Sequence, residues 1–154
     1  MKKKLLLLFI CMLTLLFVTG CDFTKKAITT DQFKKIAESK GLYAVDVQEQ
    51  FKDFSFIKEA TVAASQEGWQ IEFYVLSDKD QAKSMYNKNL KTFQDYKGSG
   101  SKELKTEIGN YNKYTLETKD YYRLLTRVDS TFLYVEVPVV VKDKVNDVID
   151  ELGY

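Results

Sequence analysis

The 154-residue chain contains no histidine, and this absence excludes much common enzyme chemistry. Histidine is the most frequent general base, a frequent zinc ligand and the partner of serine in many nucleophile systems. The stretch Lys97–Ser101 carries two glycines but lacks the spacing of a phosphate-binding loop, and no helix pattern follows it. Asp78-Lys79-Asp80 has the first ligand positions of a calcium loop without its central glycine or closing glutamate. We therefore assign no catalytic residue, no metal ligand and no cofactor.

The N-terminus has the three parts of a secretory signal. Lys2, Lys3 and Lys4 are followed by an almost unbroken apolar run from Leu5 to Val18, and small residues come next. This run is 14 residues long, whereas a helix needs about 20 to cross a bilayer. The pattern predicts an exported protein and favours a cleaved signal over an uncut membrane anchor.

The four residues Val18-Thr19-Gly20-Cys21 directly behind this run resemble the lipobox of bacterial lipoproteins. The resemblance implies cleavage before Cys21 and a diacylglycerol on the thiol of Cys21. As a whole, the chain is similar to the small bacterial lipoproteins of unassigned function. Its expected place is the outer face of the cytoplasmic membrane, and its lysine-rich composition resembles that of proteins from Gram-positive hosts.

The two cysteines, Cys11 and Cys21, fit this prediction. Cys11 would leave with the signal and Cys21 would carry the lipid, so the mature chain would have no free thiol and no internal disulfide. Removal of residues 1–20 also takes three lysines and no acid, which changes the formal charge from +1 to −2. Without a basic excess, we expect no nucleic-acid partner. The membrane partner is reached through the lipid on Cys21.

Three segments are predicted along the chain: a lipoprotein signal peptide at 1–20, a polar tether at 21–28 and a single domain at 29–154. The domain begins with a helix that Thr29 and Gln32 cap and Gly41 ends. Residues 43–57 contain Val45, Val47 and three phenylalanines that fit neither the helix nor the strand period over a useful length, and we expect a short strand or a turn there.

The remaining pattern is that of an antiparallel sheet with interspersed helices. Ser77 is expected to cap a second helix and residues 142–152 to form a third. Short turn sequences at 66–68, 109–110, 119–120 and 129–130 separate candidate strands. The candidate strands are 60–65, 70–76, 103–108, 111–118, 121–128 and 131–137. The order α-ββ-α-ββββ-α predicts an α+β fold, with a sheet of about six strands and helices packed on one face.

A possible binding face follows the strand at 121–128. Alternation places Tyr121, Arg123 and Arg127, which include both arginines of the chain, on one side of the strand. Tyrosine and arginine there suit an anionic group or a partner protein. Cross-strand tyrosine–arginine pairs without any ligand would give the same pattern. Further tyrosines in this region are Tyr111, Tyr114, Tyr122 and Tyr134.

Three function classes are compatible with these features. The first is a membrane-anchored, extracytoplasmic binding or interaction module at the cell envelope, whose partner is an envelope protein or a small ligand. The second is a protective or inhibitory surface protein. The third is a hydrolase that uses carboxylates or a serine, which would require two groups brought together across a cleft. The absence of histidine disfavours an enzyme.

Overall fold

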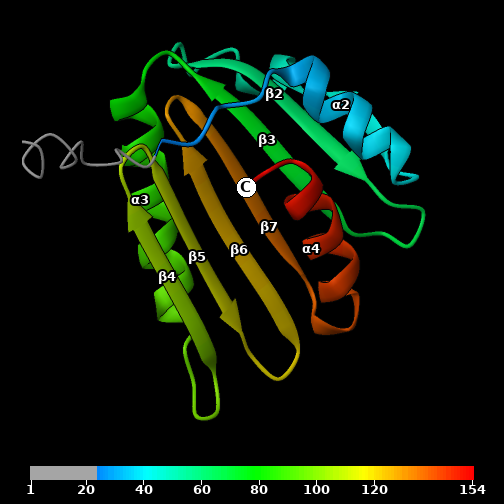
Figure 1. Ribbon diagram of the computed structural model, residues 1–154, viewed down its shortest axis with the longest axis vertical. Coiled ribbons are helices and arrows are strands. Elements are labelled where there is room, and N and C mark those ends of the chain that lie inside the picture. The colour runs from blue at the N-terminus through cyan, green and yellow to red at the C-terminus, as the bar shows by residue number, and fades with distance from the viewer. Residues whose placement is uncertain (1–23) are drawn as a thin grey trace, which may run out of the picture.

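The computed structural model describes residues 24–154, where seven strands form one antiparallel sheet in the order β1-β2-β3-β7-β6-β5-β4 (Figure 1). The predicted signal peptide and the lipobox with Cys21 lie outside the described residues. In chain order the elements are α2 (Thr30–Ser39), β1 (Tyr43–Asp46), the 3₁₀ helix η2 (Gln48–Phe51), β2 (Ile57–Ala64), β3 (Gln70–Leu76), α3 (Lys79–Asp95), β4 (Lys102–Ile108), β5 (Tyr111–Glu117), β6 (Tyr121–Val128), β7 (Thr131–Pro138), the 3₁₀ helix η3 (Val139–Val141) and α4 (Lys142–Glu151). No helix among these residues is long and apolar enough to cross a membrane.

The α+β class and the antiparallel sheet predicted from the sequence are confirmed. All six expected strands are present, and β1 adds a seventh strand that pairs with β2 at one edge. Turns at 109–110, 119–120 and 129–130 connect β4 to β7 as an uninterrupted meander. Pro138, which lacks an N–H for the ladder, is the last residue of β7.

The helices do not share one face of the sheet, and this part of the prediction is wrong. Helices α2 and α4 cover one face, where Phe33 and Ile149 join a core that includes Phe73 and Leu124. Helix α3 covers the other face, where Tyr86 and Phe93 pack with residues such as Leu125 and Phe132. Figure 1 shows α3 behind the sheet and α2 and α4 in front of it.

Local signals fix the ends of the helices. Thr29 and Gln32 form the expected capping box of α2, and Gly41 adopts φ +78° just beyond its end. Helix α3 is capped by Asp78 rather than Ser77, because the Asp78 carboxylate accepts hydrogen bonds from the N–H groups of Asp80 and Gln81 at 2.9 and 2.8 Å. The hydrogen bond from Gln81, and next the one that the Ser77 hydroxyl donates at 3.0 Å, hold the pKa of Asp78 below its usual range.

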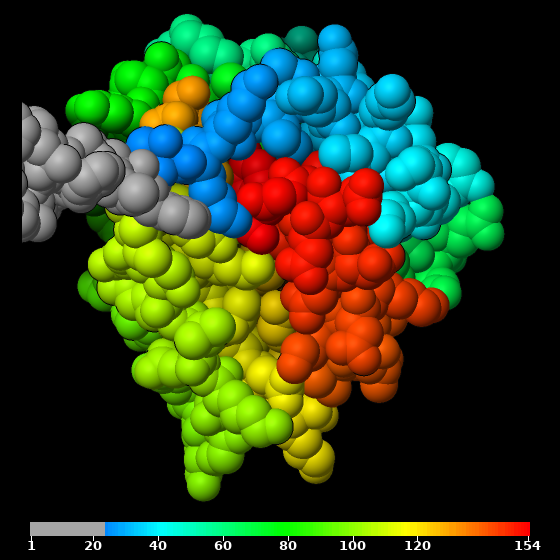
Figure 2. Space-filling model, in the orientation of Figure 1, coloured from blue at the N-terminus to red at the C-terminus, as the bar shows by residue number. Residues whose placement is uncertain are grey.

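Residues 24–28, which we call the N-terminal strap, lie against the domain instead of hanging free. Ala27 and Ile28 pack on the core beneath α2 and α4. The backbone of Lys25 makes two hydrogen bonds with the side chain of Asn110, at 2.9 and 2.7 Å. Figure 2 shows the strap running across this face beside the C-terminal residues. Of the predicted tether at 21–28, residues 25–28 contact the folded domain, and residues 21–23 lie outside the described residues.

Candidate functional site

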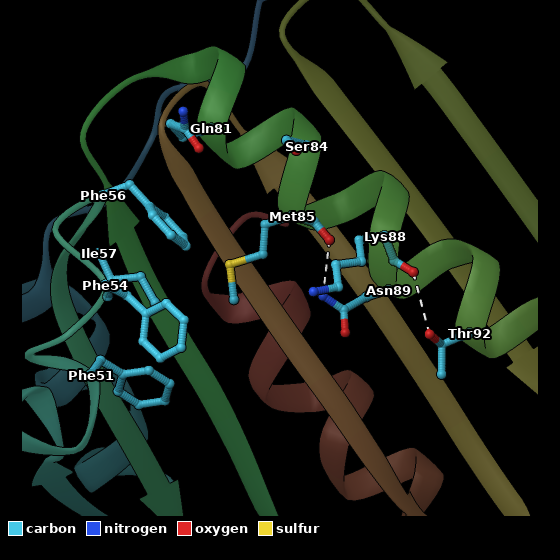
Figure 3. A pocket seen from close by; sticks show the side chains of 10 residues that line it. All are labelled: Phe51, Phe54, Phe56, Ile57, Gln81, Ser84, Met85, Lys88, Asn89 and Thr92. Atoms are coloured by element: carbon cyan, nitrogen blue, oxygen red, sulfur yellow. Dashed lines mark hydrogen bonds between the residues drawn. The ribbon is translucent and has the colours of Figure 1, made fainter.

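The α3 face carries an apolar groove of about 440 Å³ between the segment 51–57 and α3. We call it the aromatic groove. One wall comes from the chain between η2 and β2, and the other from successive turns of α3 (Figure 3). Its lining residues are Phe51, Phe54, Phe56, Ile57, Gln81, Ser84, Met85, Lys88, Asn89 and Thr92. A concave, mainly apolar site with a few polar groups is the usual form of a ligand pocket.

Three phenylalanines within six residues build the first wall. The rings of Phe54 and Phe56 meet edge to face, with centroids 5.8 Å apart, and Phe51 packs edge-on against Tyr74 at 5.4 Å. Phe54 is 49% exposed. Figure 3 shows the phenylalanine side chains and Met85 pointing into the space between the two walls. Aromatic rings and a flexible thioether supply a surface that suits apolar ligands of varied shape.

The floor of the groove continues into a second hollow of about 300 Å³ above β3 and β7. Met85 and Asn89 line both spaces. Here the hydroxyl of Tyr74 donates to Glu72 at 2.5 Å. Burial first, and then this hydrogen bond, raises the pKa of Tyr74 far above its ordinary value. The phenol is thus a neutral donor that is already engaged, so the floor offers aromatic surface rather than a free acid or base.

The α3 wall carries the polar groups. Asn89 donates to the carbonyl of Met85 at 2.9 Å and Thr92 to the carbonyl of Lys88 at 3.3 Å, so both side chains also bond to their own helix. The ammonium group of Lys88 forms no ion pair within residues 24–154. An anionic group on a ligand that lies in the groove would find its counter-charge there.

The residues of the predicted binding face lie elsewhere and are mostly covered. Because α3 packs over this side of β6, Arg123 and Arg127 are only 5% and 6% exposed, and Tyr121 is 45% exposed. Arg123 donates to Oε1 of Glu136 from Nε and Nη2, at 3.0 and 2.8 Å. Its guanidinium also lies 4.2 Å from the ring centroid of Tyr96. The cross-strand partner of Arg123 is thus a glutamate, and Tyr96 comes from the end of α3, so the contacts differ from the cross-strand tyrosine–arginine pairs considered above.

The tyrosines near these arginines do not gather on one surface. Tyr111 and Tyr122 belong to the core beneath α2 and α4. Tyr114 and Tyr134 lie on the opposite face, with α3. The sheet therefore separates these four tyrosines, which lie close together in the sequence.

The aromatic groove was not predicted. Its first wall lies in the segment 43–57, whose phenylalanines fit no regular period, and its second wall is the exposed side of α3, which carries polar residues such as Gln81 and Ser84. Three aromatic residues without a period in a loop are the one sequence signal that points to it. Within residues 24–154, no group of three or more acidic side chains is placed to hold a metal ion.

Comparisons with known proteins add little to this description. No protein-family model matches the chain, and no curated protein matches it. A solved structure of a GTP binding regulator from Thermotoga maritima aligns with 82% of this chain and 89% of its own, with 14% sequence identity and a TM-score of 0.45. At this level of similarity, no function is transferred.

Proposed function

We propose that this protein is a lipid-anchored binding module on the outer face of the cytoplasmic membrane. The lipobox Val18-Thr19-Gly20-Cys21 behind a basic and apolar segment supports the anchor. The aromatic groove supports binding, and it is the single observation on which the second half of the proposal depends. The proposed ligand has an apolar or aromatic body and an anionic group that pairs with Lys88.

Apolar side chains that line a groove favour such a ligand because its binding removes them from water. Burying a fully exposed phenylalanine is worth roughly 1.5–3 kcal/mol. Phe54 is about half exposed, so the part of its surface that a ligand covers would contribute about 1 kcal/mol. The ammonium group of Lys88 is exposed, and an ion pair there is worth at most about 1 kcal/mol. Shape and apolar contact would therefore set the affinity, and Lys88 the orientation.

Titration with anilinonaphthalene sulfonate tests the groove, because this fluorescent probe combines an aromatic body with an anionic group. We expect saturable binding to the native protein, weakened about fivefold by Phe54→Ala, in line with the loss of about 1 kcal/mol of apolar contact. Tyr43→Ala is the matched control, because Tyr43 is an aromatic residue of similar exposure (56%) on the edge strand β1, outside the groove.

A pair of lysine variants tests the charge. Lys88→Gln should weaken binding of the probe about threefold, whereas Lys91→Gln, on the same helix but outside the groove, should leave it unchanged. Equal effects of the two variants, or binding that neither Phe54→Ala nor Lys88→Gln alters, would refute the groove as the ligand site. Native circular dichroism of each variant shows that the fold is retained.

The anchor has its own test in a lipidating bacterial host. Cys21→Ala should abolish incorporation of labelled fatty acid and release the protein from the membrane. Cys11→Ala is the matched control, since Cys11 lies in the predicted signal and should leave labelling intact. Continued labelling of Cys21→Ala would contradict the anchor while leaving the groove unaffected.

A further inference from the structure

The N-terminal strap fixes the point at which the chain leaves the domain. The side chain of Asn110, in the turn between β4 and β5, bonds both the N–H and the carbonyl of Lys25. The Lys25 ammonium donates to the carbonyl of Gly153 at 2.7 Å and lies 4.2 Å from the ring centroid of Tyr111. Figure 1 shows the strap leaving the domain beside this turn. Lys25 is thus held by two separate parts of the fold, the turn region at 110–111 and the C-terminal end.

This exit point lies only four residues after Cys21. Four residues at about 3.3 Å each span at most roughly 13 Å. One end of the sheet, which we call the anchor end, contains the turns 109–110 and 129–130. The first turn of α3 lies at the same end. The turn at 119–120 lies at the other end of β5, a strand of seven residues and hence about 23 Å long. A lipid on Cys21 would hold the anchor end close to the bilayer and keep the opposite end away from it.

The anchor end has a polar hollow of about 340 Å³ with cationic side chains around it. Arg127 is 6% exposed; its Nε donates to Asn112 at 2.8 Å and its Nη1 to the carbonyl of Asp129 at 3.1 Å. Its Nη2 has no hydrogen-bond partner among the described residues. The full lining is Lys79, Asp80, Lys83, Gly109, Asn110, Arg127 and Asp129.

The charges of this hollow favour an anion. Three cationic side chains oppose two carboxylates, and one carboxylate, that of Asp129, already accepts a hydrogen bond from Asn110 at 2.9 Å. A planar guanidinium with a free N–H edge is suited to a phosphate oxygen. With a lipid on Cys21, the anchor end lies next to the bilayer surface, where phosphate groups belong to lipid headgroups.

We infer that the anchor end is a membrane-facing surface and that the hollow beside Arg127 receives the phosphate of a phospholipid headgroup. This inference depends on the proposed lipid on Cys21. The strap sets the orientation of the domain, and the lysines at positions 79 and 83 hold the headgroup. The aromatic groove follows α3 from Gln81, near the anchor end, to Thr92, towards the opposite end.

Site-specific fluorescence quenching tests the orientation. The described residues contain no cysteine, so Glu107→Cys near the anchor end and Lys119→Cys at the opposite end each accept one fluorophore in the full lipidated protein. The proteins are placed in phosphatidylcholine–phosphatidylglycerol vesicles that contain a lipid with a nitroxide on its headgroup. Because about 23 Å separates the two ends, we expect about threefold stronger quenching at position 107 than at 119. Equal quenching at positions 107 and 119, in a protein that still carries its fatty-acid label, would overturn the proposed orientation. The proposed lipid anchor on Cys21 would still stand.

Asn110→Ala tests the strap together with the hollow that Asn110 also lines, and a lysine double variant tests the hollow alone. Asn110→Ala should bring the two quenching values together, whereas Asn87→Ala, an exposed asparagine on α3, should not. The double variant Lys79→Gln/Lys83→Gln should reduce the contrast, and Lys88→Gln/Lys91→Gln, farther along the same helix, should keep it. An unchanged contrast in the first double variant overturns the headgroup site. Millimolar inorganic phosphate should also reduce the contrast, because it competes with the headgroup for the hollow; a hollow saturated with free phosphate and an unchanged contrast would overturn the headgroup site.

Discussion

Glu136→Gln is the sharpest test of the conclusion that Arg123 is a structural residue. In the register of β6 and β7, Arg123 lies directly opposite Glu136. The carboxylate accepts two hydrogen bonds from the guanidinium through Oε1 and one from the hydroxyl of Tyr134 through Oε2, at 3.0 Å. The substitution keeps the size of the side chain but removes its charge, and the arginine remains beneath α3 without an anion.

The expected loss lies between those of buried and exposed ion pairs. Breaking a fully buried pair costs about 3–5 kcal/mol, whereas an exposed pair contributes about 0–1 kcal/mol. The side chain of Arg123 is 7% exposed and that of Glu136 is 29% exposed, so solvent screens this pair in part. We therefore expect the free energy of unfolding to fall by about 2 kcal/mol.

Urea unfolding followed by the fluorescence of Trp69 measures this change. Trp69 is the only tryptophan of the chain and is 8% exposed, so its emission reports on unfolding of the core. The control is Glu49→Gln, whose partner Lys52 lies one helical turn away, with both side chains well exposed (87% and 67%). This control should change the free energy of unfolding by less than about 0.5 kcal/mol. If Glu136→Gln unfolds at the same urea concentration as the control, Arg123 does not depend on its partner and the argument fails.

Two predictions concern pH. Hydrogen bonds from Lys144 and Lys142 lower the pKa of Glu67 and of Glu117, respectively, below the ordinary value of 4.5, so the native state binds fewer protons than the unfolded state at acid pH. The free energy of unfolding, measured with urea, should therefore fall as the pH drops below 4.5. The double variant Glu67→Gln/Glu117→Gln should show a smaller fall over the same pH range. An equal fall in the double variant would contradict the lowered pKa values. At alkaline pH, burial raises the pKa of Tyr122 to about 12 against an ordinary value of 10.0. Its contribution to stability is complete below pH 10 and should be lost as the pH rises to 12. In an alkaline titration, the phenolate absorbance of Tyr122→Phe should lack one late-titrating group.

The strands could be predicted because their signals are local. Each turn of the second half carries glycine, asparagine, aspartate or serine between alternating segments, and β4 to β7 follow these signals closely. Strand β1 lacked such a signal, because Tyr43 and Val45 at the sheet edge are more than half exposed and show no contrast between faces. An edge strand with little burial gives little periodicity.

The placement of the helices could not be predicted from the same signals. The alternation in β6 favours the set that includes Leu124 for the core, since the other set contains Arg123 and Arg127. In the structure both sets are buried apart from Tyr121 at the strand's start, because those arginines have hydrogen-bond partners on the neighbouring strands and lie beneath α3. A buried arginine with hydrogen-bonded partners and an exposed arginine have the same sequence pattern. Long-range contacts, which the local sequence pattern does not contain, therefore decide whether helices cover one face of the sheet or both.

This two-sided covering also explains why the groove lies where it does. Seven strands spaced about 4.8 Å apart make a sheet about 30 Å wide, and one helix with its side chains covers about 10 Å of that width. Two helices, α2 and α4, lie on one face, but α3 lies alone on the other. The part of that face beside α3 needs another cover, and η2 with the segment 51–57 supplies it only in part, which leaves the aromatic groove at the seam. A larger side chain on the α3 wall, such as Ser84→Trp, should fill the seam, abolish binding of the fluorescent probe and leave the stability of the fold unchanged or increased.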